Sequence, residues 1–394
     1  MVERKRILFV DDEASILAGL EKSLHRERPR WELVFATGGK AGLAEIRKAP
    51  FDVVVSDMRM PGMDGAMLLQ LTQDACPTAV RILLSGYADR AALIRALPSI
   101  HQFLVKPCET AVLRRTIERS LQGAEVDRDG RLQRIIGQVD KLPSPSDIYF
   151  ELSRLIRSPT CRLGELHKVV SRDPALAAKL LQLANTAHFR LGKATTSIDR
   201  AVEILGLERL RYVALTTSVF TPSEGADYDE AVVSALQRVA LETAQLAAVI
   251  APPALRDEAF AAGLLHELGT LVLAIGFRHD LELARARIAQ GESAPAVELE
   301  RFGVTQTAIA ARLLSMWGLP DDIVDAVQFH RDPGAAPEPA RVLASLVHVA
   351  AAVVTAHRAP PVLDMASLER AGVGSLVAGW SAAAIAANLD APSG

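Results

Sequence analysis

Cysteine is scarce in this sequence of 394 residues, and the three that occur lie far apart. They are Cys76, Cys108 and Cys161. An odd number without paired spacing disfavours both a disulfide framework and a thiolate zinc site. We therefore predict three ordinary thiols in a reducing compartment, which favours a cytoplasmic protein.

An excess of charge of one sign is also missing. The chain has 44 Lys and Arg residues against 47 Asp and Glu residues, which gives a formal net charge of -3. This balance argues against a protein that binds nucleic acid over its whole surface. The small basic cluster at Arg209 and Arg211 has no interleaved aromatic residues and is typical of a solvated surface. We therefore expect no nucleic-acid partner.

Long apolar runs are rare as well. The apolar run near the N-terminus covers only residues 7–10 before acidic residues follow, which is too short for a secretory signal. The longest uncharged stretch, 371–389, is mostly Ala, Gly and Ser and contains Asn388, so it predicts a packed helix rather than a membrane span. We expect a mature chain that starts at or near Met1 and has no membrane contact.

What the sequence does contain is material for two or three domains, because 49% of its residues are hydrophobic. In the first 120 residues, five short β-rich runs alternate with stretches of helical spacing. These runs lie at 6–10, 31–35, 52–56, 81–85 and 102–105. The alternation predicts an α/β domain, with right-handed crossovers and a five-stranded parallel sheet covered on both faces. Ligands of such sheets bind at the carboxyl ends of the strands.

From about residue 110 the pattern becomes helical, and no convincing strand follows. A charged segment over 122–141 predicts a helical linker, which the prolines at 143 and 145 end. Beyond it we predict an all-α domain. Its helical segments lie at 147–157, 162–171, 174–186, 198–206, 229–250, 257–274, 280–290, 295–315, 320–329 and 339–357.

Polar residues suited to phosphoryl chemistry stand at the ends of four of the predicted strands. They are Asp11 and Asp12 after the first, Asp57 after the third, Ser85 at the end of the fourth and Lys106 after the fifth. Three carboxylates that converge at one edge would repel one another unless a cation neutralised them. Hard oxygen ligands in a compact site suit Mg²⁺. The sequence therefore predicts a magnesium site at this edge.

These motifs resemble the receiver domain of two-component response regulators, over about residues 4–121. The resemblance rests on the sequences at 10–13 (VDDE), 56–65 (SDMRMPGMDG), 84–86 (LSG) and 105–107 (VKP). It implies that Asp57 accepts a phosphoryl group from a sensor histidine kinase or a phosphotransfer protein. It also implies that Asp12 and Asp57 bind Mg²⁺ directly, that Asp11 helps through water, and that the main-chain carbonyl of Arg59 supplies another ligand.

The same resemblance assigns the residues that respond to phosphorylation. Ser85 and Lys106 would hold the phosphoryl oxygens. Phe103 would be an aromatic switch that turns inward when Ser85 moves, and an ordinary core aromatic is the equally open alternative. The family uses a cis peptide bond before Pro107 to direct the lysine, and the sequence leaves the isomer open.

In the second half, His266-Glu267 and His330 could hold a divalent metal for phosphodiester hydrolysis. However, residues from about 135 to 360 resemble an HDOD domain, a helical relative of the HD metal-dependent phosphohydrolases that has usually lost the catalytic ligands. The motifs that carry this resemblance are at 142–145 (LPSP), 173–176 (DPAL), 183–185 (LAN), 263–266 (GLLH) and 317–320 (WGLP).

The departures from an active HD enzyme decide between these interpretations. Glu267 replaces the aspartate of the HD pair, the predicted helix 229–250 contains no histidine, and Gln306 stands where a further histidine often occurs. We therefore interpret His266, Glu267 and His330 as a vestigial site, with satisfied helix histidines rather than ligands. The resemblance implies an output domain that is not an enzyme and acts on an unknown downstream protein.

Two alternatives of other classes stay open: an HD-type cyclic-dinucleotide phosphodiesterase regulated by phosphorylation, and a nucleic-acid-binding regulator. We find no basic recognition helix for the second. Dimerisation through the connector at about 108–138 also stays open, although the apolar pattern of this segment is too irregular for a coiled coil. The predicted division is a receiver domain over 1–121, a helical linker over 122–141, an HDOD domain over 142–360 and a helical tail over 361–394.

Overall fold

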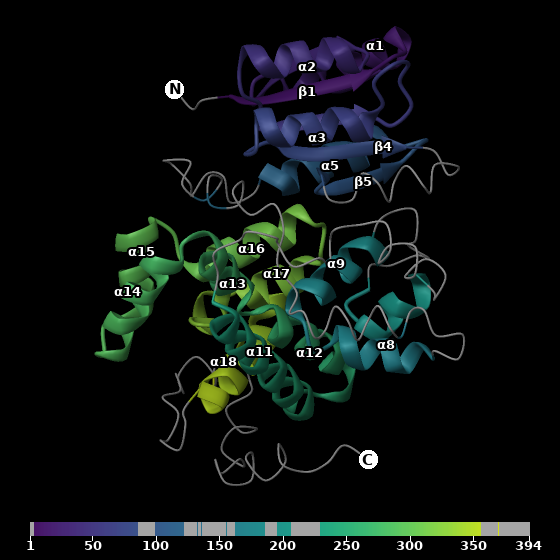
Figure 1. Ribbon diagram of the computed structural model, residues 1–394. Coiled ribbons are helices and arrows are strands. Elements are labelled where there is room, and N and C mark those ends of the chain that lie inside the picture. The colour runs from purple at the N-terminus through teal and green to yellow at the C-terminus, as the bar shows by residue number, and fades with distance from the viewer. Residues whose placement is uncertain are drawn as a thin grey trace.

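The computed structural model shows two parts, an α/β part and a helical part, which lie one above the other in Figure 1. It describes residues 4–85, 99–121, 162–185, 195–205 and 229–355, together with Leu132, Ile135, Leu155 and Glu369. Apart from Leu132, Ile135 and Glu369, the predicted linker 122–141 and tail 361–394 lie outside the described residues. The same holds for Cys161, whereas Cys76 and Cys108 are free thiols.

The N-terminal part is built on a parallel sheet. Its five strands have the order β2-β1-β3-β4-β5. They are β1 (Lys5–Asp11), β2 (Trp31–Thr37), β3 (Val53–Asp57), β4 (Val80–Ser85) and β5 (Gln102–Val105). The residues of β3 and β4 are buried throughout, as strands covered on both faces require. The register pairs Val10 with Ser56, Asp57 with Leu84 and Ser85 with Val105, so the carboxyl ends of these strands meet at one edge.

In the described residues, four helices and one short 3₁₀ turn (η1) surround this sheet. They are α1 (Ala14–Ser23), η1 (His25–Glu27), α2 (Gly39–Lys48), α3 (Gly65–Ala75) and α5 (Thr110–Leu121). Helices α2 and α3 pack against each other. Arg114 of α5 pairs with Glu27 of η1 at 3.7 Å, and Arg30 pairs with Glu118 of α5 at 3.0 Å, which ties α5 to the end of α1. The predicted alternation of strands and helices is confirmed for the described residues, and the stretch 86–98 between β4 and β5 lies outside them.

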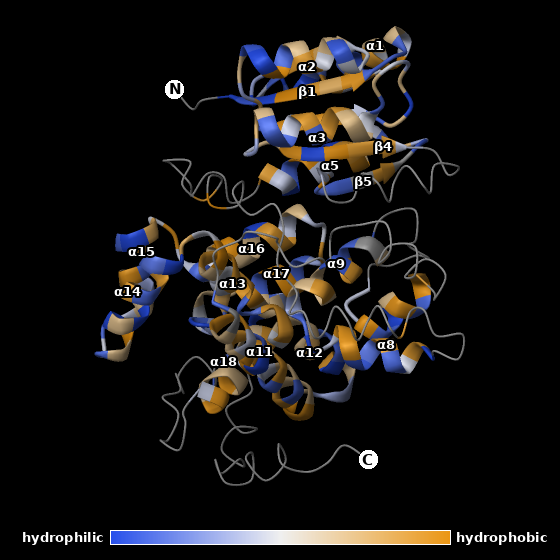
Figure 2. Ribbon diagram, viewed as in Figure 1, coloured by the Kyte–Doolittle hydropathy of each residue, from blue (hydrophilic) through white to orange (hydrophobic). Residues whose placement is uncertain are grey.

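The C-terminal part is helical in every described segment, as predicted. Its elements are α8 (Leu163–Val170), α9 (Pro174–Ala184), α11 (Glu230–Ile250), η4 (Pro253–Leu255), α12 (Arg256–Leu265), α13 (Leu268–Gly276), α14 (Arg278–Ala289), α15 (Ala294–Phe302), α16 (Gln306–Met316), α17 (Asp321–Phe329), η5 (Pro333–Ala335) and α18 (Glu338–Thr355). Helices α11, α12, α17 and α18 pack against one another and form the centre of this part. Many of their residues are apolar (Figure 2).

Two of the predicted helices were wrong in extent. The predicted helix 257–274 is two helices, α12 and α13, which separate at His266 and Glu267. The predicted helix 295–315 is also two helices, α15 and α16, because Gly303 adopts the left-handed conformation with φ 73° and ends α15. Apolar periodicity continues across both breaks because the helices on either side bury residues in the same core.

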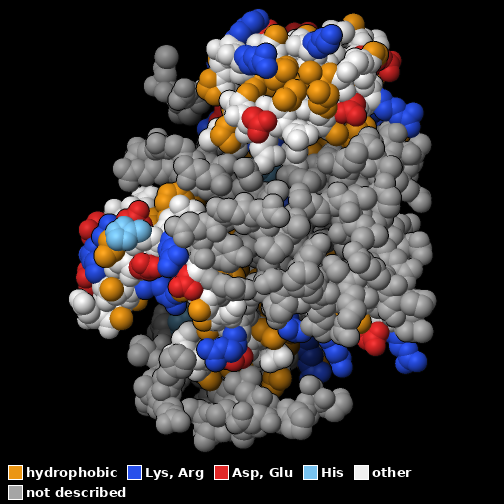
Figure 3. Space-filling view, in the orientation of Figure 1, with side chains coloured by type: hydrophobic (Ala, Val, Ile, Leu, Met, Phe, Trp, Pro, Cys, Tyr) orange, Lys and Arg blue, Asp and Glu red, His pale blue; other side chains and the backbone are white. Residues whose placement is uncertain are grey.

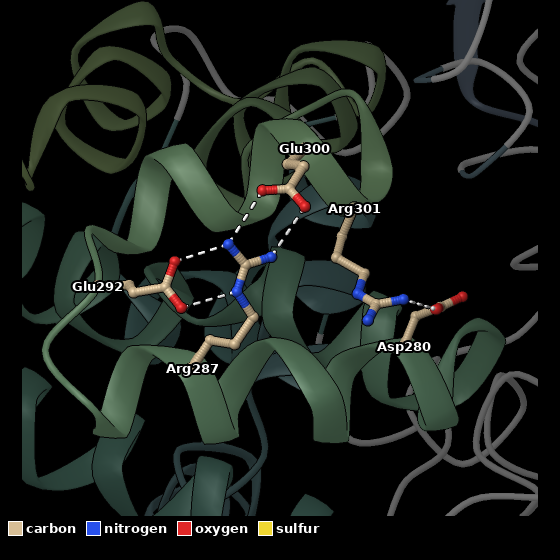
Figure 4. A network of polar contacts seen from close by, with 5 residues as sticks. All are labelled: Asp280, Arg287, Glu292, Glu300 and Arg301. Carbon is tan, nitrogen blue, oxygen red and sulfur yellow. Dashed lines mark hydrogen bonds and ion pairs between the residues drawn. The ribbon is translucent and has the colours of Figure 1, made fainter.

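Helices α14 and α15 form a hairpin that projects from the helical part (Figure 1). Phe277 and Phe302 contact edge to face at its base, with ring centroids 6.2 Å apart. Figure 4 shows Arg287 between two carboxylates, with ion pairs of 2.6 Å to Glu292 and 3.0 Å to Glu300. Acidic and basic side chains are mixed on the surface of this hairpin (Figure 3). Surface ion pairs and an aromatic contact therefore join the two helices, together with buried apolar residues such as Ala284 and Val297.

Two stretches of the described chain are long and apolar enough to cross a membrane by length and composition alone. They are Pro253–Gly276 and Glu338–Thr355, and 72% and 44% of their respective apolar windows are buried inside the structure. Core helices of soluble proteins satisfy the same criterion, so these stretches are weak evidence for a membrane span.

Candidate functional site

The structure brings three of the predicted residues together at the carboxyl edge of the sheet. Asp11 ends β1 and Asp57 ends β3, and their relative exposures are only 3% and 7%. The ammonium group of Lys106, which follows β5, lies 2.7 Å from Asp11 Oδ2 and also pairs with Asp57 Oδ1. One lysine therefore bridges two buried carboxylates that are 46 positions apart in the sequence.

The loop after β3 holds the carboxylate of Asp57 in place. The main-chain N–H of Arg59 donates to Asp57 Oδ2 at 2.6 Å, and the N–H of Gly65 donates to the carbonyl of Met58 at 2.9 Å. A Cβ atom at position 65 would lie 2.0 Å from the Asp57 carbonyl oxygen, so only glycine permits this approach. Asp64 caps α3 by accepting from the N–H of Met67 at 2.8 Å. Asp64 and Gly65 therefore fold the loop back over Asp57.

Burial and the ion pair between Asp57 and Lys106 act in opposite directions on the pKa values of these two groups. Burial raises the pKa of Asp57, the charge of Asp11 adds to the rise, and Lys106 opposes it. Burial lowers the pKa of Lys106, but its hydrogen bonds to the two carboxylates outweigh burial, so that the pKa is raised overall. The lysine is therefore charged at neutral pH and compensates part of the negative charge of the edge.

The other predicted residues of this edge lie as follows. Ser85 is buried at the end of β4, and its carbonyl accepts from the N–H of Lys106 at 2.8 Å. The peptide bond between Lys106 and Pro107 is cis. The side chain of Asp12 is exposed next to Asp11. The side chain of Phe103 lies outside the described structure, so its predicted switch role stays a prediction.

The acidic side chains at this edge are chemically suited to bind a hard divalent cation, because they offer only oxygen atoms as ligands. The geometry fits in part. Asp11 and Asp57 converge on Lys106, and the main chain of residue 59 lies against the Asp57 carboxylate. In the described part of the chain, no three His, Cys, Asp or Glu side chains are grouped closely enough to hold a metal ion. Asp11, Asp12 and Asp57 therefore do not form a closed ligand cluster in this structure.

In the helical part, the two histidines singled out from the sequence do lie together. His266 and His330 are buried, and their rings meet edge to face with centroids 5.2 Å apart. The Nδ1 atoms lie 2.6 Å from the carbonyl oxygen of Gly263 and 2.8 Å from that of Val327, respectively. Each Nδ1–H can therefore donate to the carbonyl three residues earlier, as expected for a satisfied helix histidine.

Burial keeps both imidazoles neutral. It lowers the pKa of His330 well below its usual value, and the neighbouring His266 and Arg331 lower it further. It also lowers the pKa of His266, although Glu267 acts in the opposite direction. The Nε2 atom of His266 is 3.6 Å from Glu267 Oε1, which is too far for a hydrogen bond.

Three further residues of this site were not singled out from the sequence. Glu298 is buried and accepts from the main-chain N–H of Gln306 at 2.9 Å and from Arg331 at 2.8 Å. The Nδ1 atom of His348 lies 2.9 Å from the carbonyl oxygen of His330. Arg331 directly follows His330, so adjacency could have identified it. No sequence pattern links Glu298 or His348 to the histidine pair.

Models of two protein families match the chain. The model of the response regulator receiver domain matches residues 7–118, and the model of the HDOD domain matches residues 142–333. The chain is a response regulator with a receiver domain and an HDOD domain. The sheet and its acidic edge lie in the receiver match, and the paired histidines lie in the HDOD match.

Individual curated proteins are similar to parts of the chain. The DNA-binding transcriptional regulator NtrC of Escherichia coli K12 is 30% identical over 165 residues, which cover 40% of this chain and 34% of that protein. An uncharacterized protein of Treponema pallidum is 26% identical over 215 residues, 54% of this chain and 42% of that protein. The chain therefore spans less than half the length of these curated relatives.

Two solved structures resemble larger parts of the chain. The MmoQ response regulator of Methylococcus capsulatus is 25% identical with a TM-score of 0.50, and the match covers 64% of this chain and 99% of that one. A virulence factor of Campylobacter jejuni has a TM-score of 0.52 at 19% identity, covering 66% and 95% of the two chains. At that identity the second similarity shows the fold alone.

Proposed function

We propose that phosphorylation of Asp57 controls the output of this response regulator. The observation that carries the proposal is the pairing of buried Asp57 with Lys106 beside Asp11, at the carboxyl edge of the receiver sheet. The donor is a sensor histidine kinase or a phosphotransfer protein. The chain contains both a receiver domain and an HDOD domain, which supports this role, because phosphorylation of the receiver can then regulate the domain that follows it.

The reaction is a phosphoryl transfer. A carboxylate oxygen of Asp57 forms a bond to phosphorus while the bond between phosphorus and the donor breaks, and the donor leaves with the electron pair. The ammonium of Lys106 offsets charge on the transferred oxygens, and the hydroxyl of Ser85 is the group at the end of β4 that can hold one of them. Asp11, Asp12, Asp57 and the main-chain carbonyl of Arg59 would hold Mg²⁺, which would supply further charge neutralisation when bound.

We further propose that the HDOD domain is not catalytic and acts through contacts with a downstream protein. Two features support this: His266 and His330 direct one ring nitrogen each to a main-chain carbonyl, and the Arg331–Glu298 pair adds a fixed cation beside them. A fixed cation opposes metal binding. A cyclic-dinucleotide phosphodiesterase is the alternative.

The proposed division of the chain follows the predicted one: receiver 1–121, linker 122–141, HDOD domain 142–360 and tail 361–394. Helix α18 packs against α11 and α17, which supports an output domain that continues beyond residue 333. We propose a cytoplasmic protein, as for other soluble regulators.

The test of the first proposal is labelling of the full chain by acetyl phosphate in the presence of Mg²⁺. We expect Asp57→Asn and Asp57→Ala to lower labelling at least 100-fold. The circular dichroism spectrum of Asp57→Asn should match that of the unaltered chain, which would show that its fold is preserved. Asp74→Asn, on the exposed side of α3, is the matched control and should label as the unaltered chain does. Full labelling of both Asp57 variants would move the acceptor to another residue.

The metal and the output domain need separate measurements. Addition of EDTA should abolish labelling, and excess Mg²⁺ should restore it. Incubation of the full chain with a cyclic dinucleotide and Mn²⁺ or Fe²⁺ should release no linear product. Stoichiometric, tightly bound metal together with turnover would favour the phosphodiesterase instead.

A further inference from the structure

The two domains contact each other directly, at the edge formed by β5 and α5 of the receiver. Gln102 at the start of β5 donates to the carbonyl of Ser315 in α16 at 3.3 Å, and the hydroxyl of Ser315 donates to the carbonyl of Arg119 in α5 at 3.1 Å. Gln182 of α9 donates to the carbonyl of His101 at 2.7 Å. Helix α9 therefore contacts the chain at the start of β5, and helix α16 contacts both the start of β5 and the end of α5.

A buried histidine lies in this contact. His101 has a relative exposure of 9%, and its Nδ1 accepts from the main-chain N–H of Arg81 in β4 at 2.9 Å. An imidazole that accepts at Nδ1 carries its proton on Nε2 and is neutral. The guanidinium of Arg81 lies 3.3 Å from that Nε2 atom. Protonation of His101 would therefore require the bond to the Arg81 N–H to break.

The described charged groups that act on His101 are all cations. They are Arg81 of β4, Lys179 of α9 and Arg312 of α16. Burial lowers the pKa of His101 well below its usual value, and these three charges lower it further. The nearby Arg119 of α5 is paired with Asp321 of α17 at 2.7 Å.

The cations on the HDOD side are part of the contact themselves. The guanidinium of Arg312 donates to the carbonyl of Ser120 in α5. The ammonium of Lys179 donates to Gln182 at 3.2 Å and lies 4.7 Å from the centre of the Trp317 ring. Burial, followed by the charge of Arg81, lowers the pKa of Lys179 to about 8. Docking of α9 and α16 is therefore what brings two of the three cations to His101.

We propose that His101 makes the contact between the receiver and the HDOD domain sensitive to acid, so that protonation of its imidazole separates α9 and α16 from β4 and β5. Protonation in the docked state would put a fourth positive charge among three others in a water-poor contact. Separation removes two of those charges and returns the imidazole to water. The proton therefore binds the separated form more tightly than the docked form.

The sign of the effect follows from this difference. The docked contact is fully stable above the ordinary histidine pKa of about 6.5, and it weakens roughly tenfold per pH unit below that value until the docked pKa is reached. Lys179 is already charged below about pH 8, so it adds no further dependence between pH 7 and 5. His266 and His330 also resist protonation in the HDOD core, so the test must separate their effect from that of His101.

The test measures the radius of gyration of the full chain by small-angle X-ray scattering between pH 8 and 5, with far-UV circular dichroism as a measure of helix content. We expect the radius to rise below about pH 6.5 with helix content unchanged. The decisive variant is His101→Asn, because its side-chain oxygen can still accept from the Arg81 N–H and cannot be protonated. It should stay docked over the whole range.

His279→Asn, on the exposed side of α14, is the matched control and should open as the unaltered chain does. A second variant, Lys179→Met, removes one of the cations and should move the opening to lower pH. An unaltered chain that stays docked at pH 5, or a His101→Asn variant that opens at the same pH, would overturn the proposal. Should His101→Asn fail to fold, an unchanged opening pH in Lys179→Met overturns it equally.

Discussion

Individual positions in this protein are constrained by close approaches of the main chain more than by charge. Gly65 lies over the carbonyl of Asp57, and Gly269 lies over the carbonyl of Gln306, with room for no Cβ in either place. The first approach shapes the loop that holds the proposed phosphoacceptor. The second lets α13 pack against the start of α16 beside His266.

The Gly65 approach leads to a stability prediction. We expect Gly65→Ala to destabilise the receiver by roughly 2–4 kcal/mol, because the added carbon would lie 2.0 Å from main-chain oxygen and the loop would have to move. Urea unfolding of the full chain, followed by circular dichroism, measures the change. Gly19→Ala in α1 is the control: nothing lies within 4 Å of its added carbon, and a gain of roughly 0.5–1 kcal/mol is expected. Equal midpoints for the two variants would refute the steric argument.

The buried histidines of the HDOD core lead to a pH prediction. Because burial lowers the pKa of His330, its contribution to stability is fully present above the ordinary value of about 6.5 and is lost as the pH falls toward the lowered one. His330→Asn can still donate to the carbonyl of Val327 and cannot be protonated. Its urea midpoint should therefore depend less on pH between 7 and 5 than that of the unaltered chain. Identical pH slopes would show that His330 binds its proton equally in the folded and unfolded states, which would contradict a pKa lowered by burial.

At the scale of single elements, the α14–α15 hairpin differs from the helices of the core. Among the described elements it packs on α13, and buried Glu298 of α15 also accepts from the N–H of Gln306 and from Arg331. Its two helices are further joined by the partly exposed ion pairs of Arg287 (Figure 4). Ion pairs between exposed groups contribute little to global stability. The hairpin should therefore open locally without unfolding the domain.

This difference predicts the effect of removing the central arginine of the hairpin. We expect Arg287→Gln to speed amide hydrogen exchange across residues 278–302, while the urea midpoint of the full chain stays unchanged. The reason is that Arg287 joins α14 to Glu292 and Glu300, which hold the second helix against the first. Arg285→Gln, on the exposed side of the same helix, should leave exchange as it is. Faster exchange throughout the HDOD domain would contradict a local role.

At the scale of the whole molecule, the contact between α5 and α16 connects the receiver to its output domain. Arg119 of α5 donates to the carbonyl of Leu319 and pairs with Asp321, whose side chain is 73% exposed. The ion pair is therefore the weaker of these two links, because solvent screens it. The bond to the carbonyl and the contacts of Ser315 carry more of the docking energy.

We expect Arg119→Ala to weaken docking of the two domains by about 1.5–3 kcal/mol, the contribution of a hydrogen bond that involves a charged group. The radius of gyration at pH 7.5 should rise while helix content stays constant. Arg114→Ala is the matched control on the same helix, because Arg114 pairs within the receiver, with Glu27 and Glu118. A larger radius for both variants would indicate a general loss of α5 rather than a lost domain contact.

Much of the receiver could be predicted from the sequence because its signals are local. Each strand is a short β-rich run, and the residue at its end follows within one or two positions, as Asp57 and Lys106 do. Parallel pairing then brings those ends to one edge without further information. The all-α character of the second half followed in the same way from its periodicity. Its helix boundaries did not, because a break such as Gly303 leaves the apolar pattern intact.

The motifs were thus enough to predict the family, and the alternation of short β-rich runs with helical stretches was enough to predict the parallel sheet with Asp11, Asp57 and Lys106 at one edge. The ion pairs of Lys106 with both carboxylates came from the structure. The surroundings of the histidine pair and the contact between the domains required the packed molecule. Glu298 and Arg331 meet across 33 positions, and His101 meets Gln182 across 81. Such contacts depend on the angles and distances at which helices pack, and these are set by side chains from many distant segments at once.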